Sequence, residues 1–266
     1  DLVTANSQSG DVSVLLGAGD GTFAERQDFP AGSVPRSVAI EDLNGDGIPD
    51  LVTANTNANS VSMLPGNGDG TFQAGQDFAV GSAPQSVAVG DLNGDGDADL
   101  VVANFFSDDV SVLLNDGLGG FLASQDVASG DAPVFVSLGH LNSDMFLDLA
   151  VANRNSDSVS VLLNEGDGTF QPRIDLACGD QPLSLFVDDL DGDGSTDIAV
   201  ANTSSGTVSV WLGDGDGNFE SRQDFAAGSV PFAVAGSDFD GNGSVDLVVA
   251  NLSRDSINVL PGTGDG

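Results

Sequence analysis

A six-residue phrase recurs every 49 residues along the whole chain. It reads DLVTAN at Asp1 and Asp50, DLVVAN at Asp99, DLAVAN at Asp148, DIAVAN at Asp197 and DLVVAN at Asp246. A Gly-Asp-Gly phrase, which becomes Gly-Leu-Gly at Gly117 and is usually followed two residues later by Phe, keeps the same 49-residue step, and so does a Gly-x-x-Pro phrase. A fixed period without insertions is the signature of a repeat architecture, so one structural unit must be used several times.

Each repeat is expected to contain four short strands. Residues 86–92, 99–104 and 109–114 are apolar or alternating runs, and a fourth run follows the Phe of the Gly-Asp-Gly phrase. Glycine supplies the positive φ of a hairpin turn between such runs. No window shows sustained helical periodicity. Four strands per repeat of this length predict an all-β fold, a β-propeller of four-stranded antiparallel blades, with a stacked β-solenoid as the alternative.

The repeat phase leaves both end repeats incomplete. The chain holds five intervals of 49 residues and 21 further residues, so the first repeat lacks its inner strand and the last its outer strand. We expect residues 1–266 to form a single propeller that is incomplete at both ends. Six blades, a truncated ring of seven, or five with redundant ends all stay open. The chain begins without Met, so its first residues say nothing about targeting.

Four acidic loops precede the recurring phrase in phase. They read DLNGDGIPD from Asp42, DLNGDGDAD from Asp91, DLDGDGSTD from Asp189 and DFDGNGSVD from Asp238. Oxygen-bearing side chains occupy positions 1, 3, 5 and 9, and glycine at position 6 lets the carbonyl of position 7 turn inward. Such oxygen ligands on a flexible loop favour Ca²⁺. The predicted ligands are Asp42, Asn44, Asp46, Ile48, Asp50, Asp91, Asn93, Asp95, Asp97, Asp99, Asp189, Asp191, Asp193, Ser195, Asp197, Asp238, Asp240, Asn242, Ser244 and Asp246.

Other ions and other loop types fit these sequences less well than calcium does. Mg²⁺ needs a tighter octahedron, and zinc needs the His and Cys that the chain scarcely has. An EF-hand needs a Glu at position 12, where these loops have Thr or Val. The remaining alternative is a solvated Asp/Gly turn that binds no ion. A fifth loop, HLNSDMFLD from His140, departs from the pattern and raises a transition-metal site, but we expect it to hold no calcium.

These residues carry a resemblance to a known family. The stretch SVAVGDLNGDGDADLVVAN, followed by VSVLLNDG, resembles the FG-GAP/VCBS repeats that also build the integrin α-subunit head. The resemblance implies a β-propeller with one Ca²⁺ per intact loop, all on one face, and hence about four sites here. It implies no single activity, because the family includes adhesion modules, lectins and accessory domains of secreted enzymes.

Charge and composition exclude several classes of partner and indicate a location. A net charge of −35, with 41 acids against six arginines, argues against nucleic acid or anionic lipid as a partner. No apolar stretch is long enough to cross a membrane, so no membrane insertion is expected. Extracellular calcium-binding modules have dissociation constants for Ca²⁺ of about 10⁻⁴–10⁻³ M. Loops of this kind therefore predict an extracellular or cell-surface location.

A non-enzymatic role is predicted from the scarcity of catalytic side chains. The chain has one His, one Cys, no Lys and no Tyr, and both Cys178 and Trp211 stand where other repeats have packing residues. Partners, protein or glycan, are expected on the face opposite the calcium loops. The candidate contacts there are Phe105, Phe106, Arg154 and Arg254, although ordinary loop variation would also explain them. We expect an adhesion, assembly or protein-binding module; the alternative is a carbohydrate-binding propeller or an accessory domain of a secreted polysaccharide-active enzyme.

Overall fold

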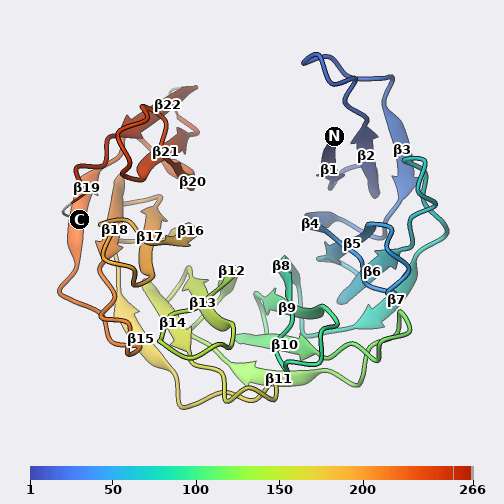
Figure 1. The fold of residues 1–266 in the computed structure, drawn as a ribbon, viewed down its shortest axis with the longest axis horizontal. Coiled ribbons are helices and arrows are strands. Elements are labelled where there is room, and N and C mark those ends of the chain that lie inside the picture. Colours follow the sequence, from blue (N-terminus) through green and yellow to red (C-terminus); the bar gives the residue numbers. More distant parts are fainter. Residues whose placement is uncertain (254, 265–266) are drawn as a thin grey trace. The chain divides into compact units, whose positions relative to one another are not determined.

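The computed structural model describes residues 1–253 and 255–264, and in these ranges it contains strands and no helix. The chain divides into two compact units, Asp1–Ala128 and Ser129–Gly266. Each unit is built from three antiparallel sheets, whose strands are labelled in Figure 1. The all-β prediction is therefore confirmed for the described residues.

The strand bounds follow the repeat. The first unit contains β1 (Leu2–Asn6), β2 (Asp11–Leu15) and β3 (Gln27–Pro30); β4 (Pro35–Glu41), β5 (Asp50–Asn55), β6 (Ser60–Leu64) and β7 (Gln76–Ala79); and β8 (Pro84–Gly90), β9 (Asp99–Asn104), β10 (Asp109–Leu113) and β11 (Gln125–Ala128). The second unit contains β12 (Pro133–Gly139), β13 (Asp148–Asn153), β14 (Ser158–Leu162) and β15 (Ile174–Ala177); β16 (Pro182–Asp188), β17 (Asp197–Asn202), β18 (Thr207–Trp211) and β19 (Gln223–Ala226); and β20 (Pro231–Ser237), β21 (Asp246–Asn251) and β22 (Ser256–Leu260).

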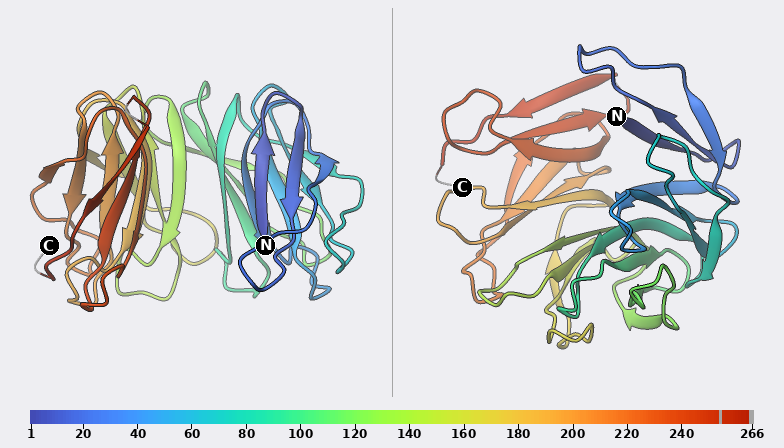
Figure 2. Two further views of the ribbon diagram at one scale, coloured as in Figure 1. Left: turned by 90° about the horizontal axis from the view of Figure 1, so that it is seen from above. Right: turned by 45° about the vertical axis from the view of Figure 1, so that its right-hand side comes forward.

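Each complete sheet is a four-stranded meander like the blade predicted from the sequence. Within the first unit β4 lies beside β8, and within the second β12 and β16 lie beside β16 and β20, respectively (Figure 1). The strands of each unit run between two ends at which the connecting loops gather (Figure 2, left). The first sheet lacks its first strand and the last sheet has only three strands among the described residues, as the repeat phase predicts.

The Gly-x-x-Pro phrase marks the start of each first strand. The register with the second strand shifts directly after this proline, between Pro35 and Ser37 in β4 and between Pro84 and Ser86 in β8. Proline has no N–H for the ladder, so an irregularity at this edge costs the sheet little. The Gly-x-Gly turns lie between the third and fourth strands; the middle residue is Asp except for Leu118, and the ten glycines of these turns before Gly264 all have φ between 73° and 87°.

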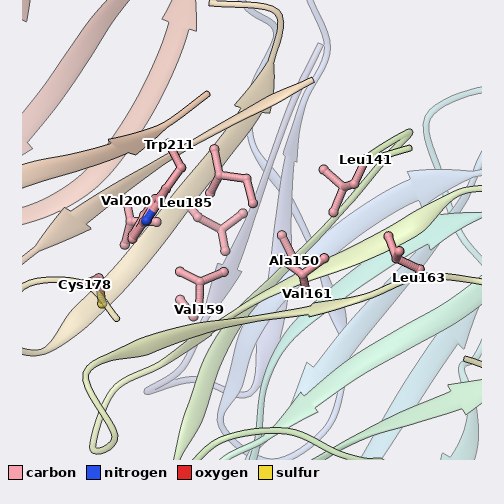
Figure 3. Packing of buried hydrophobic residues seen from close by; sticks show 11 residues of the cluster. Leu141, Ala150, Val159, Val161, Leu163, Cys178, Leu185, Val200 and Trp211 are labelled. Carbon is pink, nitrogen blue, oxygen red and sulfur yellow. The ribbon is translucent and has the colours of Figure 1, made fainter. Parts of the chain in front are cut away.

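The core lies between neighbouring sheets within each unit. In the second unit, side chains of β13, β14, β16, β17 and β18 form one apolar cluster (Figure 3). Trp211 is 3% exposed in this cluster, which confirms its packing role. Cys178 is also buried, and burial raises the pKa of its thiol to about 12, so the thiolate that a nucleophile requires is scarce at neutral pH. In the described ranges, no helix has the length and apolar character that spanning a membrane requires.

Candidate calcium sites

The four acidic loops join the first and second strands of their sheets, as predicted. They connect β4 to β5, β8 to β9, β16 to β17, and β20 to β21. The ninth residue of each loop is also the first residue of the second strand. Because these strands run in the same sense in every repeat, the loops of each unit gather at one end of its sheets.

The first acid of each loop organises the backbone around it. Asp189 accepts hydrogen bonds from the N–H of Gly192 at Oδ1 (2.7 Å) and of Gly194 at Oδ2 (2.9 Å). The two glycines have φ of 82° and 93°, a conformation that disfavours other residues. The same pair of bonds recurs at Asp42, Asp91 and Asp238. Glycine is therefore required at position 4 as well as at position 6.

The ninth acid closes the loop from inside the protein. Asp197 is fully buried and accepts hydrogen bonds of 2.8 Å from the N–H groups of Leu190, at loop position 2, and Gly213, in the turn after β18. The equivalent bonds recur at the other three loops, at Asp50, Asp99 and Asp246. The sequence predicted the acid but not its second partner, which is brought close only when the third strand pairs with the second.

At three of these ninth-position acids, burial disfavours the ionised carboxylate. It raises the pKa of Asp50 and Asp99 above their ordinary value, and it raises the pKa of Asp197 to about 6. The hydrogen bonds from backbone N–H groups work in the opposite direction, while the neighbouring acids Asp189 and Asp191 add to the rise at Asp197. A cation among these groups would favour the ionised carboxylate.

The structure brings three carboxylates together in two of the four predicted loops. One oxygen each from Asp189, Asp191 and Asp197 lies within 4.8 Å of the others. The same holds for Asp238, Asp240 and Asp246. A cluster of oxygen donors at this spacing fits Ca²⁺, which takes six to eight oxygens at about 2.3–2.6 Å.

The two loops of the first unit have an amide at position 3 instead. The Nδ2 atom of Asn44 lies 3.3 Å from Asp50 Oδ1, and Nδ2 of Asn93 lies 2.8 Å from Asp95 Oδ2. The amide oxygens of Asn44 and Asn93 accept from the N–H of position 5. These two loops carry less negative charge at position 3 than the loops at Asp189 and Asp238.

Position 5 is coupled to position 7 in every loop. The side-chain oxygens of Asp46, Asp95, Asp193 and Asn242 accept hydrogen bonds of 2.7–2.9 Å from the N–H groups of Ile48, Asp97, Ser195 and Ser244, respectively. This short turn fixes the peptide unit at position 7 close to the acidic cluster. The carbonyl oxygens of these four residues stay predicted ligands.

The fifth loop is closed differently. His140 Nδ1 lies 3.0 Å from the carbonyl oxygen of Phe146, at position 7. In the described residues, neither Ser143 nor Met145, at positions 4 and 6, has the positive φ that the glycines adopt in the other loops. Asp148 still accepts from Leu141 and Asn164, so the ninth-position closure persists without the first acid.

The proposed partner residues lie at the other end of the sheets. Phe105 and Phe106 follow β9, and their rings pack edge to face with centroids 5.1 Å apart. Phe106 is 73% exposed. Arg154, after β13, is half-buried, and its Nε is buried with no hydrogen-bond partner in the described part of the chain. Arg254 lies outside the described residues.

Similar folds occur among solved structures. A protein from Lactobacillus plantarum matches with a TM-score of 0.73 and 17% identity, over 97% of this chain and 76% of that one. An Agrocybe aegerita lectin that recognises non-reducing terminal N-acetylglucosamine matches with a TM-score of 0.61 and 18% identity, over 99% and 80% of the two chains. BBS1N, solved in complex with ARL6DN, matches with a TM-score of 0.66 and 15% identity, over 97% and 73%. At these identities the likeness shows a β-propeller-like fold alone.

The sequence itself gives a family match. No curated protein matches the chain significantly. The family model of the FG-GAP-like repeat matches residues 1–53, 42–102, 140–200 and 189–249, which together make up more than half of the chain. Each matched segment ends just after an acidic loop has passed into its second strand. The chain belongs to the FG-GAP-like repeat family.

Proposed function

We propose that this chain is a calcium-stabilised, extracellular β-propeller that acts as a non-enzymatic adhesion, assembly or protein-binding module. The observation that carries the proposal is the convergence of Asp189, Asp191 and Asp197, repeated at Asp238, Asp240 and Asp246. We take residues 1–266 as one propeller with incomplete first and last blades, six or a truncated seven in number. Membership of the FG-GAP-like family supports this assignment.

Calcium would act here on stability. Each ion would neutralise carboxylates that the loops hold close together. In the described part of the chain these include the buried ninth-position acids Asp50, Asp99 and Asp197, which have no cationic partner there. Four ions would offset eight of the negative charges on a chain of net charge −35. A site at tenfold saturation stabilises the fold by about 1.4 kcal/mol. The acids lie at the junction of two strands. We therefore expect bound calcium to stabilise the folded state and to hold the acidic loops in one conformation.

Calorimetric titration with Ca²⁺ tests the metal assignment. We expect about four ions per chain and a melting temperature that falls when a chelator is added. Replacing Asp189 and Asp191 by Asn should remove one site. Asp131→Asn, an exposed acid outside the loops, is the matched control and should leave the stoichiometry unchanged. A stoichiometry near zero, or the same melting temperature with and without chelator, would overturn the proposal.

Glycan binding is a second candidate because of the aromatic pair at Phe105 and Phe106. A highly exposed ring beside a second ring is typical of surfaces that stack on sugars or anchor a protein partner. The similar fold of the Agrocybe aegerita lectin supports glycan binding as a candidate. A glycan array separates the two candidates: selective binding that free sugar competes away, and that Phe106→Ala abolishes, would favour the lectin role over protein binding.

A further inference from the structure

The chain contains four Asn-Gly pairs, a dipeptide prone to cyclise. The side-chain Cγ of asparagine forms a five-membered ring when the next backbone nitrogen attacks it, and glycine has no Cβ to obstruct that approach. The pairs are Asn44-Gly45, Asn67-Gly68, Asn93-Gly94 and Asn242-Gly243. The first three all begin the tetrapeptide Asn-Gly-Asp-Gly. Differences in reactivity among those three must therefore come from the fold.

In the three pairs that lie in acidic loops, the glycine N–H is bonded to the first acid of the loop. Gly45, Gly94 and Gly243 donate to Asp42 Oδ1 at 2.9 Å, Asp91 Oδ1 at 2.7 Å and Asp238 Oδ2 at 2.9 Å, respectively. The glycine nitrogen must lose its proton before it can attack. A carboxylate at this distance holds the proton and disfavours negative charge on the nitrogen.

The asparagine side chains of these loops are also held in place. The Oδ1 atoms of Asn44, Asn93 and Asn242 accept hydrogen bonds of 3.0, 2.9 and 2.7 Å from the backbone N–H two residues later. Asn44 and Asn93 are half-buried as well. Attack on Cγ would therefore require these asparagines to give up a second hydrogen bond.

The fourth pair lies in the exposed turn between β6 and β7 and lacks such protection. Within the described ranges, the N–H of Gly68 has no hydrogen-bond acceptor. In the next two repeats the equivalent glycine donates to the Oδ1 of Asn115 at 3.0 Å or of Asn164 at 2.9 Å. Gly66 stands at the position of these two asparagines and has no side-chain acceptor.

The side chain of Asn67 is held at one end only. Its Nδ2 donates to Thr71 Oγ1 at 2.9 Å, and no group in the described part of the chain donates to its Oδ1. Both Asn67 and Gly68 are exposed. The amide group can turn toward the nitrogen of Gly68 once a single exposed hydrogen bond breaks.

We propose that Asn67 is a site of spontaneous deamidation and isoaspartate formation in the folded protein, and that the first acids of the loops protect the other three asparagines. The nitrogen of Gly68 gives its proton to hydroxide and forms a bond to Cγ of Asn67. The bond from Cγ to Nδ2 breaks, and Nδ2 takes a proton from water and leaves as ammonia. Water then opens the succinimide ring at either carbonyl, which yields aspartate or isoaspartate.

The two products should differ in their effect on the acidic loop that begins at Asp42. Gly66, next to Asn67, donates its N–H at 2.8 Å to the buried ninth acid of that loop, Asp50. Three other repeats have an acid at the position of Asn67, namely Asp116, Glu165 and Asp214. Aspartate should therefore fit this turn. Isoaspartate lengthens the backbone directly beside the N–H that closes the loop and should loosen it.

Timed incubation of the protein at mildly alkaline pH, followed by peptide mass spectrometry, measures the rate at each asparagine. Circular dichroism verifies that the chain stays folded, with and without added Ca²⁺. Asn67 should react at least about tenfold faster than Asn44, Asn93 or Asn242, because each of these must first break an N–H bond to a carboxylate. Asn67→Gln should abolish the product, since glutamine would need a larger ring.

Two synthetic peptides are the matched control for the effect of the fold. They copy residues 42–48, DLNGDGI, and residues 65–71, PGNGDGT. Neither has the folded environment, so their asparagines should react at similar rates. In the protein, Asp42→Ala should raise the rate at Asn44 toward that at Asn67.

Four outcomes would overturn the inference. The first is an equal rate at Asn44, Asn67 and Asn93 in the folded protein. The second is a preference for Asn67 that the two peptides reproduce. The third is an unreacted Asn67 after a period that converts the peptide of residues 65–71. The fourth is a rate at Asn44 that Asp42→Ala leaves unchanged while the variant is folded. The inference does not depend on the proposed function, because the four rates can be compared whether or not the loops bind calcium.

Discussion

The Oδ2 atom of Asp197 accepts a hydrogen bond of 2.8 Å from the backbone N–H of Leu190, seven residues earlier in the chain. Its Oδ1 atom accepts an equally short bond from Gly213, sixteen residues later. One buried carboxylate thus joins the acidic loop, the second strand and the turn after the third. The predicted calcium ligand has a structural task that exists before any ion binds.

Replacing Asp197 by Ala should therefore destabilise the protein even in chelator. Two buried N–H groups would lose their acceptors, at about 1–3 kcal/mol each, so we expect a loss of about 2–5 kcal/mol in the free energy of unfolding. Guanidinium denaturation measures it. Asp193→Asn, in the same loop but exposed, keeps an oxygen for the Ser195 N–H and should stay within about 0.5 kcal/mol of wild type. Equal stability of both variants would contradict this role.

Asp197 should also give the calcium-free protein a characteristic dependence on pH. Burial raises its pKa from the ordinary value of 3.8 to about 6, so between these values the folded state binds more protons than the unfolded state. The contribution of Asp197 to the free energy of unfolding must then fall as pH rises through this window. Denaturation in chelator at several pH values, compared with Asp197→Asn, isolates that contribution. A variant with the same pH profile as wild type would refute the assignment, and saturating calcium should suppress the fall because it binds the ionised form.

The core offers a test that is independent of the metal. Trp211 pairs with Ile198 and fills a cluster that includes Leu185 and Val200 (Figure 3). Truncation to Ala should cost about 3–5 kcal/mol in the free energy of unfolding. Trp211→Leu, which restores the residue of the other repeats, should cost at most about 2 kcal/mol. Chemical denaturation of the two variants measures both losses, and a negligible loss for Trp211→Ala would show that the ring itself packs poorly.

Much of the architecture could be predicted from the sequence because equivalent positions recur in every repeat and can be compared with one another. The 49-residue step located the strands, the Gly-Asp-Gly turns and the acidic loops. Contacts between repeats carried no such signal: the edge-to-face packing of Phe72 on Phe29 joins positions that the repeat pattern does not couple. The backbone before the proline of each Gly-x-x-Pro phrase was also unpredictable. Val34 and Val230 have φ of 59° and 60°, although a β-branched residue before proline favours an extended conformation.

The fifth loop shows how few changes separate a closed turn from a calcium loop. His140, Ser143 and Met145 stand where the intact loops have Asp, Gly and Gly, while Asp144 and Asp148 are retained. The triple substitution His140→Asp, Ser143→Gly, Met145→Gly should let the backbone adopt the two positive φ values and free the Phe146 carbonyl from the imidazole. We expect one additional Ca²⁺ per chain in a calorimetric titration.

The double variant Ser143→Gly, Met145→Gly is the matched control for this gain of a site. It supplies the backbone freedom but leaves His140 in place of the first acid, so the loop should still bind no additional ion. A site gained by the double variant would show that backbone path alone limits binding at this loop. If the triple variant gains nothing although it folds, the pattern of acids and glycines is insufficient for a calcium site, and the assignment of the other four loops would weaken with it.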